Sequence, residues 1–154
     1  MGISENENEN ENEFSNAELT EIEKIIENKK NEDILKLDTN EINSQKTEII
    51  EELCLAKSEE KNLLKKLKNY RLIENLNDIF IGSYIRSISL KNPNLIKLNS
   101  GGLIIDIEFN DNPIIILKNN LNKIFQIDFN QSIIFQKLSQ QEEIILQISD
   151  YINN

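Results

Sequence analysis

The sequence predicts an α+β fold in which N-terminal helices, one of them long and coiled-coil-like, precede a small antiparallel β-barrel and a C-terminal helix. Up to residue 76, and again from residue 139, apolar side chains recur every three or four positions, as in amphipathic helices. Between residues 78 and 138 they recur every second position, with Asn, Gly or Pro turns about every 8–12 residues, as in short antiparallel strands. A chain of 154 residues suits one modest domain with appendages.

Residues 1–14 are predicted to form a disordered acidic tail. Glu and Asn alternate from residue 5 to residue 13, which leaves no apolar face and makes the segment repel itself. One interpretation is a solvating or charge-mimicking tail. The other, which we favour, is a repeat that expanded by slippage in an AT-rich gene, because the 28 isoleucines and 24 asparagines of the chain share AT-rich codons.

Two helices are predicted before the sheet. Ser15 and Glu18 form a capping box that opens a short helix and linker over residues 15–37. Asp38 or Thr39 opens a long helix over residues 38–76, whose apolar residues follow a 7-residue repeat. Two arrangements of this helix remain open: a homo-oligomeric coiled coil, or an antiparallel hairpin with the first helix that packs on the downstream domain.

Residues 78–138 are predicted to form five or six strands that close into a small barrel, similar to SH3-like or Tudor-like barrels. Closure would remove the exposed strand edges that isoleucine-rich strands otherwise use to aggregate. The expected core-facing series of one strand is Leu103, Ile105, Ile107 and Phe109. Over residues 139–154, Ser139 and Glu142 form a further capping box that opens the C-terminal helix.

The composition excludes several classes of chemistry. The chain has no histidine and only one cysteine, so Ser-His-Asp catalysis, Cys-His catalysis and ordinary zinc sites are excluded. We therefore expect no enzymatic activity, no cofactor and no metal. The net charge of −10 argues against nucleic-acid binding. No apolar run approaches the roughly 18 residues of a membrane span, and the N-terminus lacks the features of a signal peptide, so a cytoplasmic location is expected.

Four residues are predicted to contact a partner: Tyr84, Arg86, Asp106 and Glu108. Arg86 lies in the inward series of its strand, which is unusual for a charged side chain; it is expected either to pair with an acidic residue at the barrel rim or to lie at a partner interface. Asp106 and Glu108 share one face of their strand. A metal site there is weighed against a solvated outer face, and the solvated face is favoured.

Five short motifs carry a family resemblance. They are Gly82-Ser83-Tyr84-Ile85-Arg86, Gly101-Gly102, Ile116-Leu117-Lys118-Asn119, Phe125-Gln126-Ile127 and Ile134-Phe135-Gln136-Lys137. This part of the chain resembles small β-domain proteins of giant nucleocytoplasmic DNA viruses, in which a Gly-x-Tyr-Ile/Val-Arg strand opens the domain and an aromatic-x-Lys strand ends it. The resemblance implies a viral setting, in the host cytoplasm or in the virus particle, and no active site.

The sequence as a whole favours a non-enzymatic interaction or scaffold protein. Its barrel would contact a protein partner, and residues 38–76 would oligomerise or pack locally. The alternative is a minor structural protein of a virus particle that acts as a spacer or cement.

Overall fold

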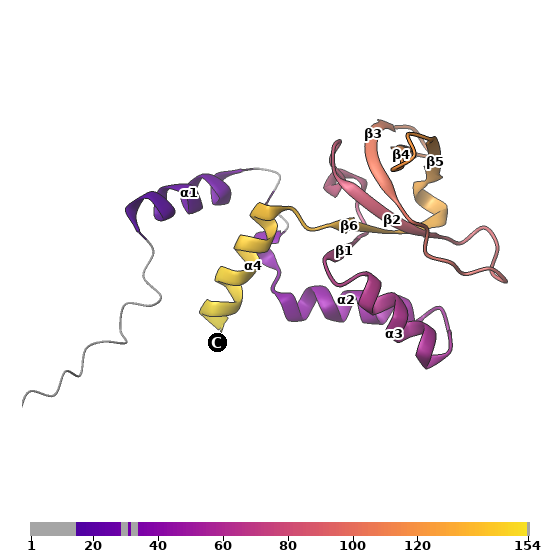
Figure 1. Ribbon diagram of the computed structural model, residues 1–154, viewed down its shortest axis with the longest axis horizontal. Helices are drawn as coiled ribbons and strands as arrows, with labels where there is room; N and C mark the ends of the chain where they lie inside the picture. Colours follow the sequence, from indigo (N-terminus) through magenta and orange to yellow (C-terminus); the bar gives the residue numbers. More distant parts are fainter. Residues whose placement is uncertain (1–14, 29–30, 32–33, 154) are drawn as a thin grey trace, which may run out of the picture.

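The computed structural model describes residues 15–28, 31 and 34–153 (Figure 1). The predicted tail of residues 1–14 lies outside this part. Four α-helices are described, α1 (Asn16–Glu27), α2 (Thr39–Glu51), α3 (Lys57–Lys66) and α4 (Gln140–Asn153). Six strands are described, β1 (Tyr70–Ile73), β2 (Tyr84–Ser89), β3 (Gly102–Glu108), β4 (Ile114–Lys118), β5 (Ile124–Asp128) and β6 (Ser132–Lys137). Short 3-10 helices are described at Ile34–Lys36 (η2), Leu76–Asp78 (η3) and Phe129–Gln131 (η4).

The strands form one open antiparallel sheet in the order β1-β6-β2-β3-β4-β5. The predicted closed barrel is therefore wrong, and β1 and β5 are free edges. β2 pairs with β3 only where Tyr84 faces Leu103 and Ile85 faces Gly102. Beyond Ile85 the two strands separate, and the connecting segment of residues 90–101 lies along β2, with a bridge between Ile88 and Leu98 and hydrogen bonds between Ser87 and Asn99.

The curled sheet encloses the main hydrophobic core on its inner side. The buried residues of this core are all isoleucine except Leu117, and all except Ile79 lie on the strands. They are Ile73, Ile79, Ile85, Ile104, Ile107, Ile115, Leu117, Ile127 and Ile134. Burial of such side chains stabilises the fold by about 1.5–3 kcal/mol each.

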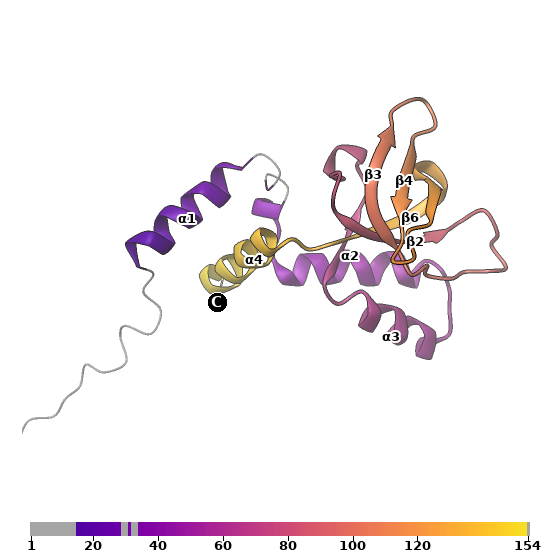
Figure 2. The ribbon, with the colours of Figure 1, turned by 45° about the horizontal axis from the view of Figure 1, so that its top comes forward.

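The opposite side of β1, β6 and β2 is covered by α2 and α3, which lie next to each other against it (Figures 1 and 2). Ile50 of α2 and Leu67, just after α3, are fully buried there against Phe135 and Ile88. The ammonium of Lys46 is buried in the same layer and donates to the carbonyl oxygens of Leu67 at 2.9 Å and Lys68 at 3.4 Å. This lysine therefore ties α2 to the end of α3.

The long coiled-coil helix predicted over residues 38–76 is also wrong. α2 begins at the predicted Asp38 cap, whose Oδ1 accepts from the amide of Glu41, but it ends at Glu51. Cys54 has a φ of 55°, which reverses the chain before α3. Tyr70–Ile73 then forms a strand. Ile49, Leu53, Leu63 and Leu67 of the expected seam pack in the layer against the sheet instead, and Ile42 packs with residues of α4.

A β-bulge changes which side of β3 faces the core. The register between β3 and β4 shifts between Ile104 and Asp106. Ile104 is 1% exposed and Ile107 is 9% exposed, whereas Leu103 and Ile105, both expected inside, are 47% and 40% exposed. The predicted alternation is therefore inverted before the bulge and correct after it for Ile107, but wrong for Phe109, which lies beyond the end of β3 and is 68% exposed.

α4 lies between the sheet and α1, beside η2 and α1 (Figure 1). Ile145 and Leu146 of α4 form a second, smaller core with Ile25, Ile34 and Ile42. The predicted capping boxes at Ser15–Glu18 and Ser139–Glu142 are both confirmed by reciprocal hydrogen bonds.

Candidate functional site

The candidate site is the outer face of β3, β4 and β5, meaning the side that points away from the core. Its side chains form three rows across the strands, and each row follows from the pairing registers. The rows are Leu103–Lys118–Ile124, Asp106–Ile116–Gln126 and Glu108–Ile114–Asp128. The exposed Ile105 of the bulge adds to this set. No described helix covers this face, whereas the same side of β1, β6 and β2 carries α2 and α3 (Figures 1 and 2).

Large apolar side chains are exposed on the outer face and at the turns beside it. Ile124 is 64% exposed, in the same row as Leu103. Phe109, in the turn after β3, is 68% exposed, and Leu121, in the turn between β4 and β5, is 77% exposed. Single exposed apolar residues are ordinary, but several on one uncovered sheet surface and its turns are what a contact surface would require.

The predicted residues Asp106 and Glu108 both lie on this outer face. Asp106 faces Ile116 of β4, and Glu108 faces Ile114. The Oδ1 atom of Asp106 accepts from the amide of Ile107 at 2.8 Å, so this carboxylate also stabilises the bulge. Their common face, expected from the sequence, is confirmed. They place acidic groups beside the exposed apolar side chains.

Tyr84 and Arg86 of β2 lie on the same side of the sheet, but their side chains bond the backbone of the segment that leads into β3. The Tyr84 hydroxyl donates to the carbonyl oxygen of Ser100 at 2.7 Å, and Nε of Arg86 donates to that of Asn99 at 2.9 Å. Arg86 thus bonds a backbone carbonyl rather than the acidic partner that was one of the two expectations. Together the two side chains hold the end of the segment that leads into β3.

Tyr70 of β1 lies near the same pair of side chains. Burial raises the pKa of the Tyr70 hydroxyl; the Arg86 guanidinium opposes this pKa shift and the Tyr84 hydroxyl adds to it. Tyr70 belongs to the hydrophobic layer beneath α2 and α3. Tyr70, Tyr84 and Arg86 therefore contribute to the packing of the sheet, whereas Asp106 and Glu108 are exposed on its outer face.

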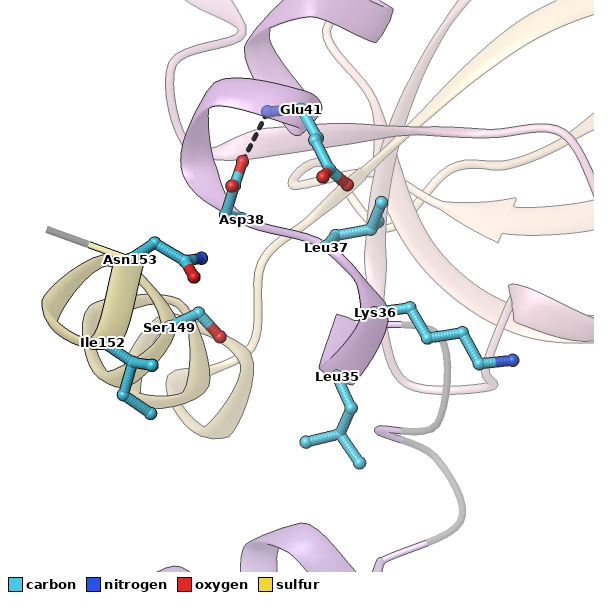
Figure 3. Close-up of a pocket in the computed structure, with 8 residues that line it drawn as sticks. All are labelled: Leu35, Lys36, Leu37, Asp38, Glu41, Ser149, Ile152 and Asn153. Atoms are coloured by element: carbon cyan, nitrogen blue, oxygen red, sulfur yellow. Dashed lines mark hydrogen bonds between the residues drawn. The ribbon is translucent and has the colours of Figure 1, made fainter.

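A cavity of about 210 Å³ lies where the chain enters α2, next to the end of α4 (Figure 3). The Asp38 carboxylate that borders it is engaged by the amide of Glu41, and the Lys36 side chain extends away from it. Leu35, Leu37 and Ile152 line much of the remainder. The cavity gathers no set of groups suited to catalysis.

The described residues offer neither a clustered metal site nor a membrane-spanning helix. Within residues 15–28, 31 and 34–153, no three or more carboxylate or thiol groups come together as a metal site would require. In the same part of the chain, none of the helices has both the length and the apolar character needed to cross a bilayer.

Comparison with known proteins gives no relative: no protein-family model, curated protein or solved structure matches this chain. The resemblance to β-domain proteins of giant viruses therefore stays a prediction.

The apolar half of the outer face was not predicted from the sequence. Leu103 and Ile105 were both assigned to the core. The bulge at Ile105 and the open edge at β5 decide their exposure, and neither feature has a Gly or Pro signal at its position. The sequence did contain one signal for Ile124. This residue comes directly after a turn, and because the next residue, Phe125, points inward, alternation directs Ile124 outward.

Proposed function

We propose that this chain is a non-enzymatic protein-binding module and that the outer face of β3–β5 binds its partner. The observation that supports this most strongly is the row Leu103–Lys118–Ile124, in which the apolar members are 47% and 64% exposed on a sheet surface that no described helix covers. Aliphatic side chains displayed on a rigid sheet lose little conformational freedom on binding, which favours a specific contact.

The proposed partner carries Lys or Arg residues around an apolar contact surface. Asp106 and Glu108 lie on the outer face, and the described residues give neither an ion-pair partner. Acidic groups at the border of an apolar patch raise the association rate with a basic partner and disfavour acidic competitors. A cytoplasmic location is part of this proposal, and a chain with a single cysteine suits a reducing compartment.

The proposal is tested by comparing binding by the full chain with binding by two variants. Leu103→Ser with Ile124→Ser removes the apolar contact, and Leu95→Ser, at a residue 64% exposed in the segment before β3, is the matched control. After proximity labelling in cells identifies a partner, the purified pair is titrated by calorimetry. We expect the double variant to weaken binding at least tenfold and the control to bind normally. Equal affinities for all three proteins would contradict the proposal.

The acidic residues are tested separately. Asp106→Asn with Glu108→Gln keeps side chains of the same shape, and the amide introduced by Asp106→Asn retains an oxygen that can accept from the Ile107 amide. The association rate should fall severalfold at low salt and less at high salt, because screening removes the long-range attraction. An unchanged rate at low salt would show that the partner is not basic at this contact.

A further inference from the structure

The free edge of β5 has unpaired backbone groups that an additional strand would bond. The amide of Asn119 donates to the carbonyl of Lys123, and the amide of Phe129 donates to that of Pro113, so ladder bonds to β4 recur at every second residue between them. By this alternation, the amides of Ile124, Gln126 and Asp128 point away from β4, as do the carbonyls of Ile124 and Gln126. No described residue bonds these outward groups.

A cavity of about 210 Å³ runs along this edge. Four consecutive residues of β5, from Phe125 to Asp128, form one wall. Opposite them are β2 and the segment that follows it, through the residues Ser87, Ser89, Lys91, Lys97 and Asn99, with Ser132 at one end. Three hydrogen bonds join Ser87 and Asn99, which holds this second wall in place. The cavity, which we call the slot, lies between the edge of β5 and the part of β2 that β3 does not pair.

The slot is positively charged although the protein is acidic. Its charged residues are Lys91, Lys97 and Asp128. The ammonium of Lys91 forms an ion pair with a carboxylate oxygen of Asp128, whereas Lys97 has no ion-pair partner among the described residues. Two lysines and three serine hydroxyls are suited to carboxylates. The slot therefore combines an unpaired strand edge with a preference for acidic side chains.

We propose that the slot accepts residues 4–13 of a second copy of this chain as an added strand. Glu occupies every odd position from Glu5 to Glu13, and Asn occupies the positions between. In a strand, alternate side chains point to opposite faces. The Glu side chains would point toward the lysines and serines of the slot, and the Asn side chains would lie beside Ile124, Gln126 and Asp128, where further carboxylates would be repelled.

The position of α1 indicates that the second copy supplies the strand. α1 follows directly after the acidic segment, and it lies at the opposite end of the long axis from β5 (Figures 1 and 2). A chain spans at most about 3.6 Å per residue. Residues 4–13 would themselves form the strand in the slot, so the same chain would have almost no residues left to reach back to α1. This inference does not depend on the proposed partner, because it rests on the backbone groups at the edge of β5 and on the slot.

The test uses the full-length chain and a fluorescent synthetic peptide with the sequence of residues 4–13. A matched control peptide has the same composition, with its Glu and Asn residues in two separate blocks. Gln126→Pro removes the outward amide of β5 without removing a bond to β4, and edge strands tolerate proline. Gln126→Ala keeps the amide and is its control, and Lys97→Gln removes the unpaired charge.

We expect the alternating peptide to bind more tightly than the block peptide, to bind Gln126→Ala normally, and to bind Gln126→Pro and Lys97→Gln at least fivefold more weakly. The amides of Ile124, Gln126 and Asp128 should also become protected from hydrogen exchange in the unaltered protein, a readout that needs no variant. Light scattering should show association at high protein concentration that Gln126→Pro reduces.

Three results would overturn the proposal: no peptide binding at low salt, equal binding of the two peptides together with normal binding by Gln126→Pro, or a monomer at every concentration.

Discussion

The Nε atom of Arg71 on β1 lies 2.9 Å from the Oε2 atom of Glu142 on α4, and the two side chains are only 5% and 6% exposed. The other oxygen of Glu142 accepts from the amide of Ser139, the N-terminal cap of α4. A single carboxylate thus caps one helix and joins it to the sheet, and it connects the small core around α4 to the rest of the protein.

Removing one member of this pair should be strongly destabilising. Arg71→Met or Glu142→Gln leaves a buried group without its ionic partner, and each is expected to lower the free energy of unfolding by about 3–5 kcal/mol. The double variant should lose less than the sum of the two single losses. Urea denaturation of the four proteins measures this coupling. Additive losses would show that Arg71 and Glu142 contribute independently.

Gly101 and Gly82 offer a matched pair of substitutions. Both have positive φ, 86° and 92°. A Cβ at Gly101 would lie within 2.3 Å of the carbonyl oxygen of Ile85, whereas nothing lies within 4 Å of one at Gly82. Gly82→Ala should therefore cost only the backbone strain of about 1–2 kcal/mol, and Gly101→Ala about 3 kcal/mol or more because overpacking adds to that strain. Thermal unfolding compares them, and similar losses would refute the close approach of Gly101 to β2.

Arg86 is predicted to matter for stability more than for binding. Arg86→Ala removes its bond to the Asn99 carbonyl and the packing of its stem against Gly101. The expected loss is about 1–2 kcal/mol. Tyr84→Phe, which removes only the bond to Ser100, should cost about 1 kcal/mol. Unaltered melting temperatures in both variants would show that these bonds do not hold the segment.

Lys46 should make stability depend on pH. Burial lowers the pKa of its ammonium below the ordinary value of 10.5. Between the lowered pKa and 10.5 the unfolded chain binds more protons than the folded chain, so the free energy of unfolding should rise with pH in this window. Lys46→Met removes the titrating group and should remove this contribution. Urea denaturation at about pH 8 and about pH 10 tests it, and an identical pH dependence in both proteins would contradict it.

Local signals predicted the helix starts and most strands. Ser15, Asp38 and Ser139 mark helix starts correctly because a cap depends on residues only three positions apart. The end of α2 was missed because Cys54 adopts positive φ without a Gly or Pro nearby. That turn lets Ile50 and Leu67 reach the same buried layer, a tertiary requirement that no window of the sequence contains.

The candidate site was predicted only in part, for a similar reason. Period-two alternation placed Asp106 and Glu108 on one face, but it cannot reveal a bulge, so Leu103 was assigned to the core. Nor can alternation show whether a sheet closes. The open edge at β5 depends on how β2 and β3 separate after Ile85.

The central claim, that the outer face of β3–β5 binds a protein partner, is tested most directly by hydroxyl-radical footprinting of the chain with and without its purified partner. We predict that Leu103, Ile105 and Ile124 lose most of their reactivity in the complex, while Leu95 and Ile81, which are also well exposed, keep theirs. Unchanged labelling of Leu103, Ile105 and Ile124, with protection elsewhere, would contradict the claim.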